Sequence, residues 1–178
     1  MYESILKFWF EDILPSQWWV KNEDFDKLIL DKFLNLHKKA VKCELFEWRQ
    51  SPRGRLGEII ILDQLSRNIY RNTPKAFEND HLALSLSQEA IFNHVEKKLN
   101  KEEMLFVYMP FMHSESLAIQ KISIKYFQNL SLKKNLEYAY KHYEVIKKFG
   151  RFPHRNDILN RRSTFEERKF LMKPGSTF

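Results

Sequence analysis

The sequence predicts an all-α protein, organised as a single all-helical domain of about eight or nine helices over residues 1–178. Apolar residues recur at three- and four-residue steps through most of the chain, which is the period of a helix face. Glycine and proline are scarce, with 4 and 6 residues, so tight turns are few and a many-stranded sheet is disfavoured. Capping residues stand where several periodic segments begin or end.

In the first half of the chain the sequence pattern predicts three helices. Residues 3–10 form a short apolar segment, and residues 23–42 carry apolar side chains at helical spacing. Ser51-Pro52 interrupts the pattern, and a second long helix is expected over residues 53–70. The sequence Asn72-Thr73-Pro74 ends that helix.

Three further helices are expected in the middle of the chain. Asn79-Asp80 offers an N-cap for a helix over residues 81–95. Asn100 caps a short helix that is expected to end before Pro110. Ser114 is expected to cap a helix over residues 115–129.

The last third of the chain has the clearest helix boundaries. Residues 134–149 form a helix that Gly150 closes at the position after its last turn. Pro153 suits the first turn of a short helix over residues 153–159. Thr164 and Glu167 have the spacing of a capping box for a final helix over residues 164–172.

Composition and charge limit the classes of function. The net charge of +7 favours anionic partners, although a lysine-rich solvated surface gives the same number. The sequence has no zinc-finger, RRM or KH signature, so nucleic acid is disfavoured as a partner. The apolar stretches are too short to span a bilayer, and the N-terminus does not resemble a signal peptide. With one cysteine and no possible internal disulfide, the chain is expected to be cytoplasmic.

The arginines are unevenly distributed. Every arginine falls within residues 49–71 or 151–168, and neither window contains a lysine. A guanidinium is a planar fork that grips a carboxylate or phosphate in two places, whereas an ammonium is a hydrated point charge. Two interpretations stay open: the arginines tie helix ends and loops together, or they form an anion site.

A polar stripe interrupts the apolar helix expected at residues 53–70. Asp63 lies on the same face as Leu56 and Ile59, and Arg67 is one turn further along, beside Asn68. A buried charge is costly unless it is paired, so Asp63 and Arg67 either pair internally or face a cavity that holds a polar ligand.

Histidines mark two other segments that can supply such a cavity. His113 and Glu115 precede a predicted helix, and His142 lies on a helical stripe with Tyr138 and Val145. A lone histidine on an apolar face is more often a core residue satisfied by the chain. The alternative is that these histidines and Glu115 exchange protons with a ligand.

The segment FGRFPHRN, residues 149–156, is the third candidate. If Pro153 starts a helix, His154, Arg155 and Asn156 lie in its first turn, where backbone N–H groups attract anions. Arg151 and Arg155 add guanidinium forks. The same groups can equally bind an acidic side chain such as Asp63 or Glu115.

Several motifs together resemble one protein family. LDQLSRNIYRNTPKAF (62–77), YMPFMHSE (108–115) and FGRFPHRNDIL (149–159) resemble the domain of unknown function 924 family, and ILKFWF (5–10) and RSTFEERKFL (162–171) match its two ends. The resemblance implies a tetratricopeptide-repeat-like, right-handed helical array. It implies no reaction, because no activity is assigned to the family.

The chain departs from the family pattern at four places. Leu65-Ser66 stands where the family usually has Phe-Pro, and Phe165 stands where it usually has proline. Asn72 and Asn160 each stand where it usually has glycine. These departures concern loop shape and leave the charged motif residues intact.

Two hypotheses of function follow. The first is a pocket for a small carboxylate or phosphate, with catalysis an open question and the cofactor unknown. Its proton-transfer candidates are Asp63, His113, Glu115 and His142, and its ligand-binding candidates are Arg67, Asn68, Arg151, His154, Arg155 and Asn156. A metal held by His113, Glu115 and His142 is a weaker option, because no metal-binding spacing requires it. The second hypothesis is a tetratricopeptide-like module whose groove binds an acidic peptide or protein.

Overall fold

The computed structural model describes residues 2–176, and within this range the chain is helical and contains no strand. The prediction of an all-α fold is therefore confirmed. The chain divides into two units, residues 2–71 with 75–110 and residues 72–74 with 111–176, and each is described by itself. The predictions of a single domain and of a right-handed tetratricopeptide-like array stay predictions.

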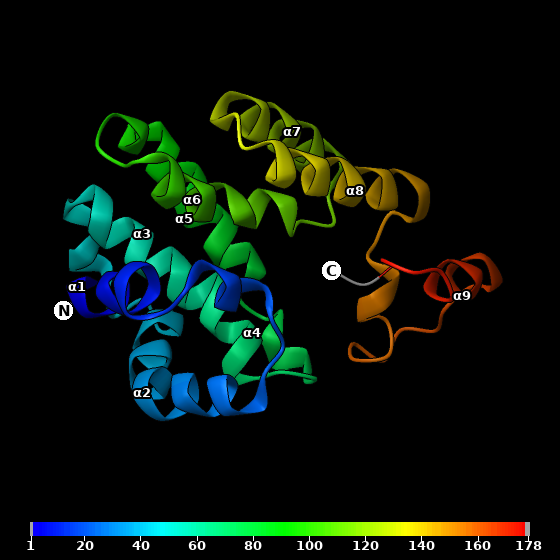
Figure 1. The fold of residues 1–178 in the computed structure, drawn as a ribbon, viewed down its shortest axis with the longest axis horizontal. Helices are drawn as coiled ribbons and strands as arrows, with labels where there is room; N and C mark the ends of the chain where they lie inside the picture. Colours follow the sequence, from blue (N-terminus) through cyan, green and yellow to red (C-terminus); the bar gives the residue numbers. More distant parts are fainter. Residues whose placement is uncertain (1, 177–178) are drawn as a thin grey trace. The chain divides into compact units, whose positions relative to one another are not determined.

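The first unit is built from short and medium helices (Figure 1). Trp9, Phe106, Ile29 and Leu56 are among its fully buried side chains. Its elements are α1 (Tyr2–Lys7), η1 (Phe8–Asp12), η2 (Pro15–Trp19), α2 (Glu23–Val41), η3 (Phe46–Gln50), α3 (Pro52–Ile60), η4 (Ile61–Leu65), α4 (Ser66–Ile69), α5 (Asp80–Phe92), η6 (Val95–Lys97) and most of α6 (Lys101–Met112). The short turn η5 (Pro74–Ala76) lies at the boundary between the units.

The second unit is a helical pair followed by an irregular segment. Helices α7 (Leu117–Leu130) and α8 (Lys133–Phe149) lie side by side (Figure 1). The 3-10 turn η7 (Pro153–Arg155) and helix α9 (Phe165–Leu171) complete it. Phe152 is fully buried and packs with Val145 and Ile146 of α8.

The helix boundaries follow several of the capping predictions. Gly150 closes α8 in the left-handed conformation, with φ of 70°, and its N–H donates to the Ile146 carbonyl. Thr164 and Glu167 form the predicted capping box at the start of α9. The cap of α7 is Ser116, whose hydroxyl accepts from the Ile119 N–H, so the prediction of Ser114 is wrong by two residues.

The helix predicted over residues 53–70 is divided. A π-helical turn, η4, lies between α3 and α4. A π turn adds one residue to a helical turn, and the spacing of apolar residues does not reveal this addition. The helix expected to end before Pro110 continues to Met112. Proline removes only one backbone hydrogen bond in that last turn, and the side chains of Phe111 and Met112 beyond it are buried.

Two asparagines adopt the conformation that the family pattern implied for glycine. Asn72 has φ of 60° and Asn160 has φ of 53°, both in the left-handed region. Asparagine tolerates this region better than other non-glycine residues do, so both turns keep their shape without glycine.

Candidate functional site

The polar residues of the first unit pair with one another. The Asp63 side chain is fully buried and accepts a hydrogen bond of 2.6 Å from the Gln64 amide. Arg67 Nη2 lies 3.9 Å from Asp63 Oδ1 and 2.7 Å from Asp80 Oδ1, and Arg67 Nη1 donates to the Ala76 carbonyl. This arrangement matches the internal pairing that the sequence left open, because Asp63 and Arg67 find partners within the chain.

Asn68 belongs to a second cluster in the same unit. Its amide nitrogen donates to Asp26 Oδ1 at 2.8 Å, and the Arg71 guanidinium grips both oxygens of the same carboxylate. Asp26 lies on α2, whereas Asn68 lies on α4. The hydrogen bond between Asn68 and Asp26 therefore joins these two helices.

In the second unit, side chains fix the loop that carries His113. The Gln120 amide nitrogen donates to the carbonyls of Met112 and Ser114 at 2.7 and 2.8 Å. Arg155 Nη2 donates to the carbonyl of His113 at 3.2 Å. Three consecutive carbonyls are thus held by two side chains, so the position of His113 is defined by α7 and by the turn η7.

Glu115 holds two loops together. Its carboxylate accepts from both terminal nitrogens of Arg161, at 2.7 and 2.9 Å, and from the Phe152 N–H at 2.8 Å. Burial raises the pKa of Glu115, but the Arg161 fork and the Phe152 N–H outweigh burial, and the pKa is lowered overall. An ionised carboxylate with these partners is better suited to positioning the loops than to exchanging protons with a ligand.

His142 is the deepest histidine of this unit. Its side chain is buried, and Nδ1 lies 2.8 Å from the Tyr138 carbonyl oxygen. A carbonyl oxygen only accepts, so Nδ1 carries the proton in the neutral ring. Burial, assisted by the neighbouring His113, Arg155 and His154 and opposed by the hydrogen bond to Tyr138, lowers the pKa of His142 to about 3. His142 is therefore neutral near pH 7, close to the Arg155 guanidinium.

Phe152 brings these basic groups together. The His142 and His154 ring centroids lie 5.4 and 5.6 Å from that of Phe152, and the Arg155 guanidinium carbon lies 4.6 Å from it. The rings of His113 and His142 lie 6.4 Å apart. We call His113, His142, His154 and Arg155 the histidine cluster. His142 and Arg155 are buried, whereas His113 and His154 are half-buried, so the cluster extends from the interior to the surface.

Arg151 has an acidic partner within the chain. Its guanidinium donates to both oxygens of Glu167, at 2.6 and 2.8 Å, and to the Arg162 carbonyl at 2.9 Å. The carboxylate of Glu167 also caps α9 through the Thr164 N–H. Arg151 therefore anchors α9, and the histidine cluster does not include it.

Asn156 also has a partner on each side of its amide. Its nitrogen donates to Ser163 Oγ at 3.1 Å, and its oxygen accepts from Arg161 Nε at 3.1 Å.

The prediction that residues 153–159 form a helix is wrong, because only the single turn η7 forms. The N–H groups of Arg155 and Asn156 donate to the carbonyls of Phe152 and Pro153, both at 3.0 Å. These two N–H groups are thus engaged in the turn, so the helix-terminus argument for anion binding does not apply.

Sequence reasoning did not single out Gln120. It lies on the inward stripe of α7 with Ser123, Phe127 and Leu130, all buried. Asp63 was noticed because it is a polar residue on the apolar face of a predicted helix. Gln120 and Ser123 have the same position on the helix over residues 117–130, so the same argument identifies them.

The predicted site residues separate into two groups. Asp63, Arg67 and Asn68 belong to the first unit, and the others belong to the second. The expectation that both groups line one cavity stays a prediction. Among residues 2–176, no three His, Cys, Asp or Glu side chains are grouped closely enough to hold a metal ion.

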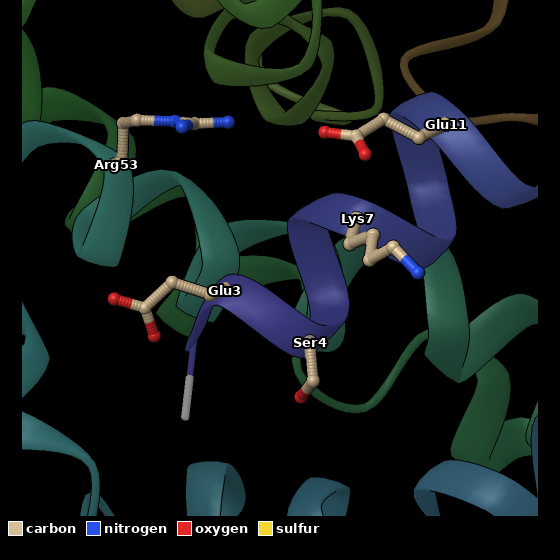
Figure 2. A pocket seen from close by; sticks show the side chains of 5 residues that line it. All are labelled: Glu3, Ser4, Lys7, Glu11 and Arg53. Atoms are coloured by element: carbon tan, nitrogen blue, oxygen red, sulfur yellow. The ribbon is translucent and has the colours of Figure 1, made fainter.

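A surface hollow of about 310 Å³ lies elsewhere, in the first unit (Figure 2). Its lining consists of Glu3, Ser4, Lys7, Glu11 and Arg53. Lys7 pairs with Asp12 at 3.4 Å, and Arg53 pairs with Glu103 at 3.1 Å. With both signs of charge in its lining, the hollow shows no preference for an anion.

Within the described residues no helix is both long and apolar enough to cross a membrane.

Comparison with known proteins identifies the family. The family model described as bacterial protein of unknown function (DUF924) matches residues 5–175. The chain belongs to the DUF924 family. A solved structure, titled as the protein of unknown function ATU0120 from Agrobacterium tumefaciens, is 34% identical, with a TM-score of 0.91 and 96% of each chain covered. No curated protein matches the chain. The resemblance inferred from the DUF924 motifs is thus confirmed, and the histidine cluster lies within the matched residues.

Proposed function

We propose that the histidine cluster binds a small anionic ligand through a carboxylate or phosphate group. The observation that carries the proposal is the convergence of three histidines and Arg155 around Phe152, with one face buried and the other partly open. The Arg155 guanidinium in a partly desolvated space attracts an anion more strongly than it does in water.

The surrounding hydrogen bonds support the proposal by keeping the cluster in place. Glu115 joins the loop after α6 to Phe152, and Gln120 and Arg155 hold the His113 backbone. A site whose groups are already oriented loses little conformational entropy on binding. His142 is neutral and its Nδ1–H donates to the Tyr138 carbonyl, so its Nε2 is an acceptor, the role that proton transfer from a ligand requires.

A thermal-shift screen of the purified chain tests the proposal. The panel contains inorganic phosphate, phosphorylated metabolites and small carboxylates. At about a hundred times its Kd a ligand stabilises the folded protein by about 2.7 kcal/mol, which gives a measurable rise in Tm. We expect several phosphates or carboxylates to raise Tm in a saturable manner. If no anion of the panel does so, the proposal is wrong.

Matched variants locate the effect. His113→Gln changes a half-buried histidine of the cluster, and His81→Gln makes the same change at an exposed position of α5. Arg155→Gln and Arg162→Gln form a second pair, because both remove one positive charge but Arg162 is exposed. The ligand-induced shift is expected to fall in the first member of each pair only. Equal loss in both members would indicate a nonspecific charge effect.

The alternative is a module that binds an acidic peptide, with arginines as the binding groups. Arg49, Arg53, Arg71, Arg151 and Arg161 each pair with a carboxylate of the chain. A peptide would have to displace these pairs, which makes the small-ligand proposal the better supported one.

A further inference from the structure

The Gln120 side chain has a defined orientation. Its NH2 group donates to the carbonyls of Met112 and Ser114, on the two sides of His113. Only the nitrogen of an amide donates, so these two contacts determine which end of the side chain is oxygen. Oε1 is attached to the same carbon as Nε2, and it therefore lies beside the His113 loop of the histidine cluster.

The Gln120 oxygen is a buried acceptor without a partner among the described residues. The Gln120 side chain is fully buried, and no donor of residues 2–176 reaches Oε1. Ser123 lies three residues further along the same inward face of α7, is also fully buried, and its hydroxyl is likewise unpartnered among those residues. Buried polar atoms without a hydrogen bond are costly, so both atoms require a partner from outside the described residues, a ligand or a buried water.

The polar atoms of α7 that lack a partner within residues 2–176, together with the nearby Arg155 guanidinium, predict which chemical groups the ligand contains. Resting on the proposed function, we infer that the ligand carries a hydroxyl or amino group close to its anionic group. The hydroxyl or amino hydrogen is donated to Gln120 Oε1, the Ser123 hydroxyl supplies a second polar contact, and the anionic group faces Arg155. Arg155 and Gln120 bond to adjacent carbonyls of the same loop, which brings the two side chains to one short stretch of backbone.

Matched ligand pairs test this inference on the full chain. The pairs are glycolate with acetate, L-lactate with propionate, and glycerol 3-phosphate with propyl phosphate, with affinities measured by isothermal titration calorimetry. A site built to bond a hydroxyl discriminates strongly against the analogue that lacks it. We expect the hydroxylated member to bind at least about tenfold more tightly in at least one pair.

Two variants assign the preference to α7. Ser123→Ala removes a hydroxyl that has no partner among the described residues, and the variant is expected to fold normally. Gln120→Leu also removes the bonds to the His113 loop, and it is expected to be less stable. The measured quantity is the ratio of affinities within a pair, which a loss of stability alone does not change. The ratio is expected to fall towards one in Gln120→Leu and to decrease in Ser123→Ala.

The outcomes separate this inference from the proposed function. If both members of every pair bind equally, the inference is wrong, a buried water is the partner of Gln120, and the anion site stands. If no member of any pair binds and no anion of the wider panel raises Tm, the proposed function fails as well. If the hydroxylated preference persists unchanged in both variants, Gln120 and Ser123 are not its source.

Discussion

Replacing Glu167 by glutamine tests how the second unit is held together. Glu167 accepts two hydrogen bonds from Arg151, at 2.6 and 2.8 Å, and one from the Thr164 N–H at 2.7 Å. Glu167 is only 2% exposed, whereas the Arg151 side chain is 28% exposed. Glu167→Gln keeps the shape of the side chain and removes the charge. It leaves the buried end of the pair with weaker hydrogen bonds.

The pKa of Glu167 gives the expected size of the effect. The Arg151 guanidinium lowers this pKa from 4.5 to about 2, with burial opposing and the Thr164 N–H assisting. Each pH unit between the two values corresponds to about 1.4 kcal/mol, which sets a ceiling of roughly 3 kcal/mol. Solvent around Arg151 screens the pair, and the glutamine oxygen still accepts hydrogen bonds although its NH2 group does not, so we expect a loss of about 2 kcal/mol.

Urea denaturation at several pH values measures this loss. The folded pKa is depressed, so the contribution is present above pH 4.5 and is lost as the pH falls towards 2. The stability difference between the wild type and Glu167→Gln is therefore expected to be about 2 kcal/mol at pH 7 and to shrink towards zero at the acidic end. A difference below about 0.5 kcal/mol at pH 7, or one that does not change with pH, would refute the reasoning.

Three other substitutions have expected outcomes. Asn160→Ala is expected to cost about 1 kcal/mol in chemical denaturation, because alanine is strained at φ of 53°, whereas Asn160→Gly is expected to cost nothing measurable. Burial lowers the pKa of His37 to about 4, so the folded wild type keeps this ring neutral and loses stability as the pH falls from 6.5 to 4. His37→Gln is expected to make the free energy of unfolding depend less on pH in this range, and an unchanged pH profile would contradict this. Phe165→Pro is expected to leave Tm unchanged or slightly raised, because Thr164 already has the extended conformation that precedes proline, with φ of −70° and ψ of 169°; a fall of several degrees would show that the Phe165 ring matters.

Local signals in the sequence were sufficient where short-range chemistry decides the structure. Gly150 and the Thr164–Glu167 capping box were predicted, because each depends on residues within one helical turn. The π turn at residues 61–65 and the shortening of the helix after Pro153 were not predicted. Neither changes the apolar pattern on which the prediction depended.

The partners of the charged residues were beyond local reasoning. Arg161 and Glu115 are 46 residues apart in the chain, and Asp26 and Arg71 are 45 apart. The sequence showed that arginine forks were concentrated in two windows, but only the fold shows which carboxylate each fork meets. For most of them the structural interpretation applies. Arg155 differs, because it is buried against Phe152 and bonds to the His113 backbone within the histidine cluster.

The most direct test of the anion site is NMR of the six histidine side chains, labelled with ¹⁵N, during titration with inorganic phosphate. The account predicts saturable changes in the signals of His113, His142 and His154, and small changes in those of the exposed His81 and His94. The same response is expected in Arg162→Gln and a weaker one in Arg155→Gln. Linear drift of all six histidines, without saturation, would contradict the existence of the site.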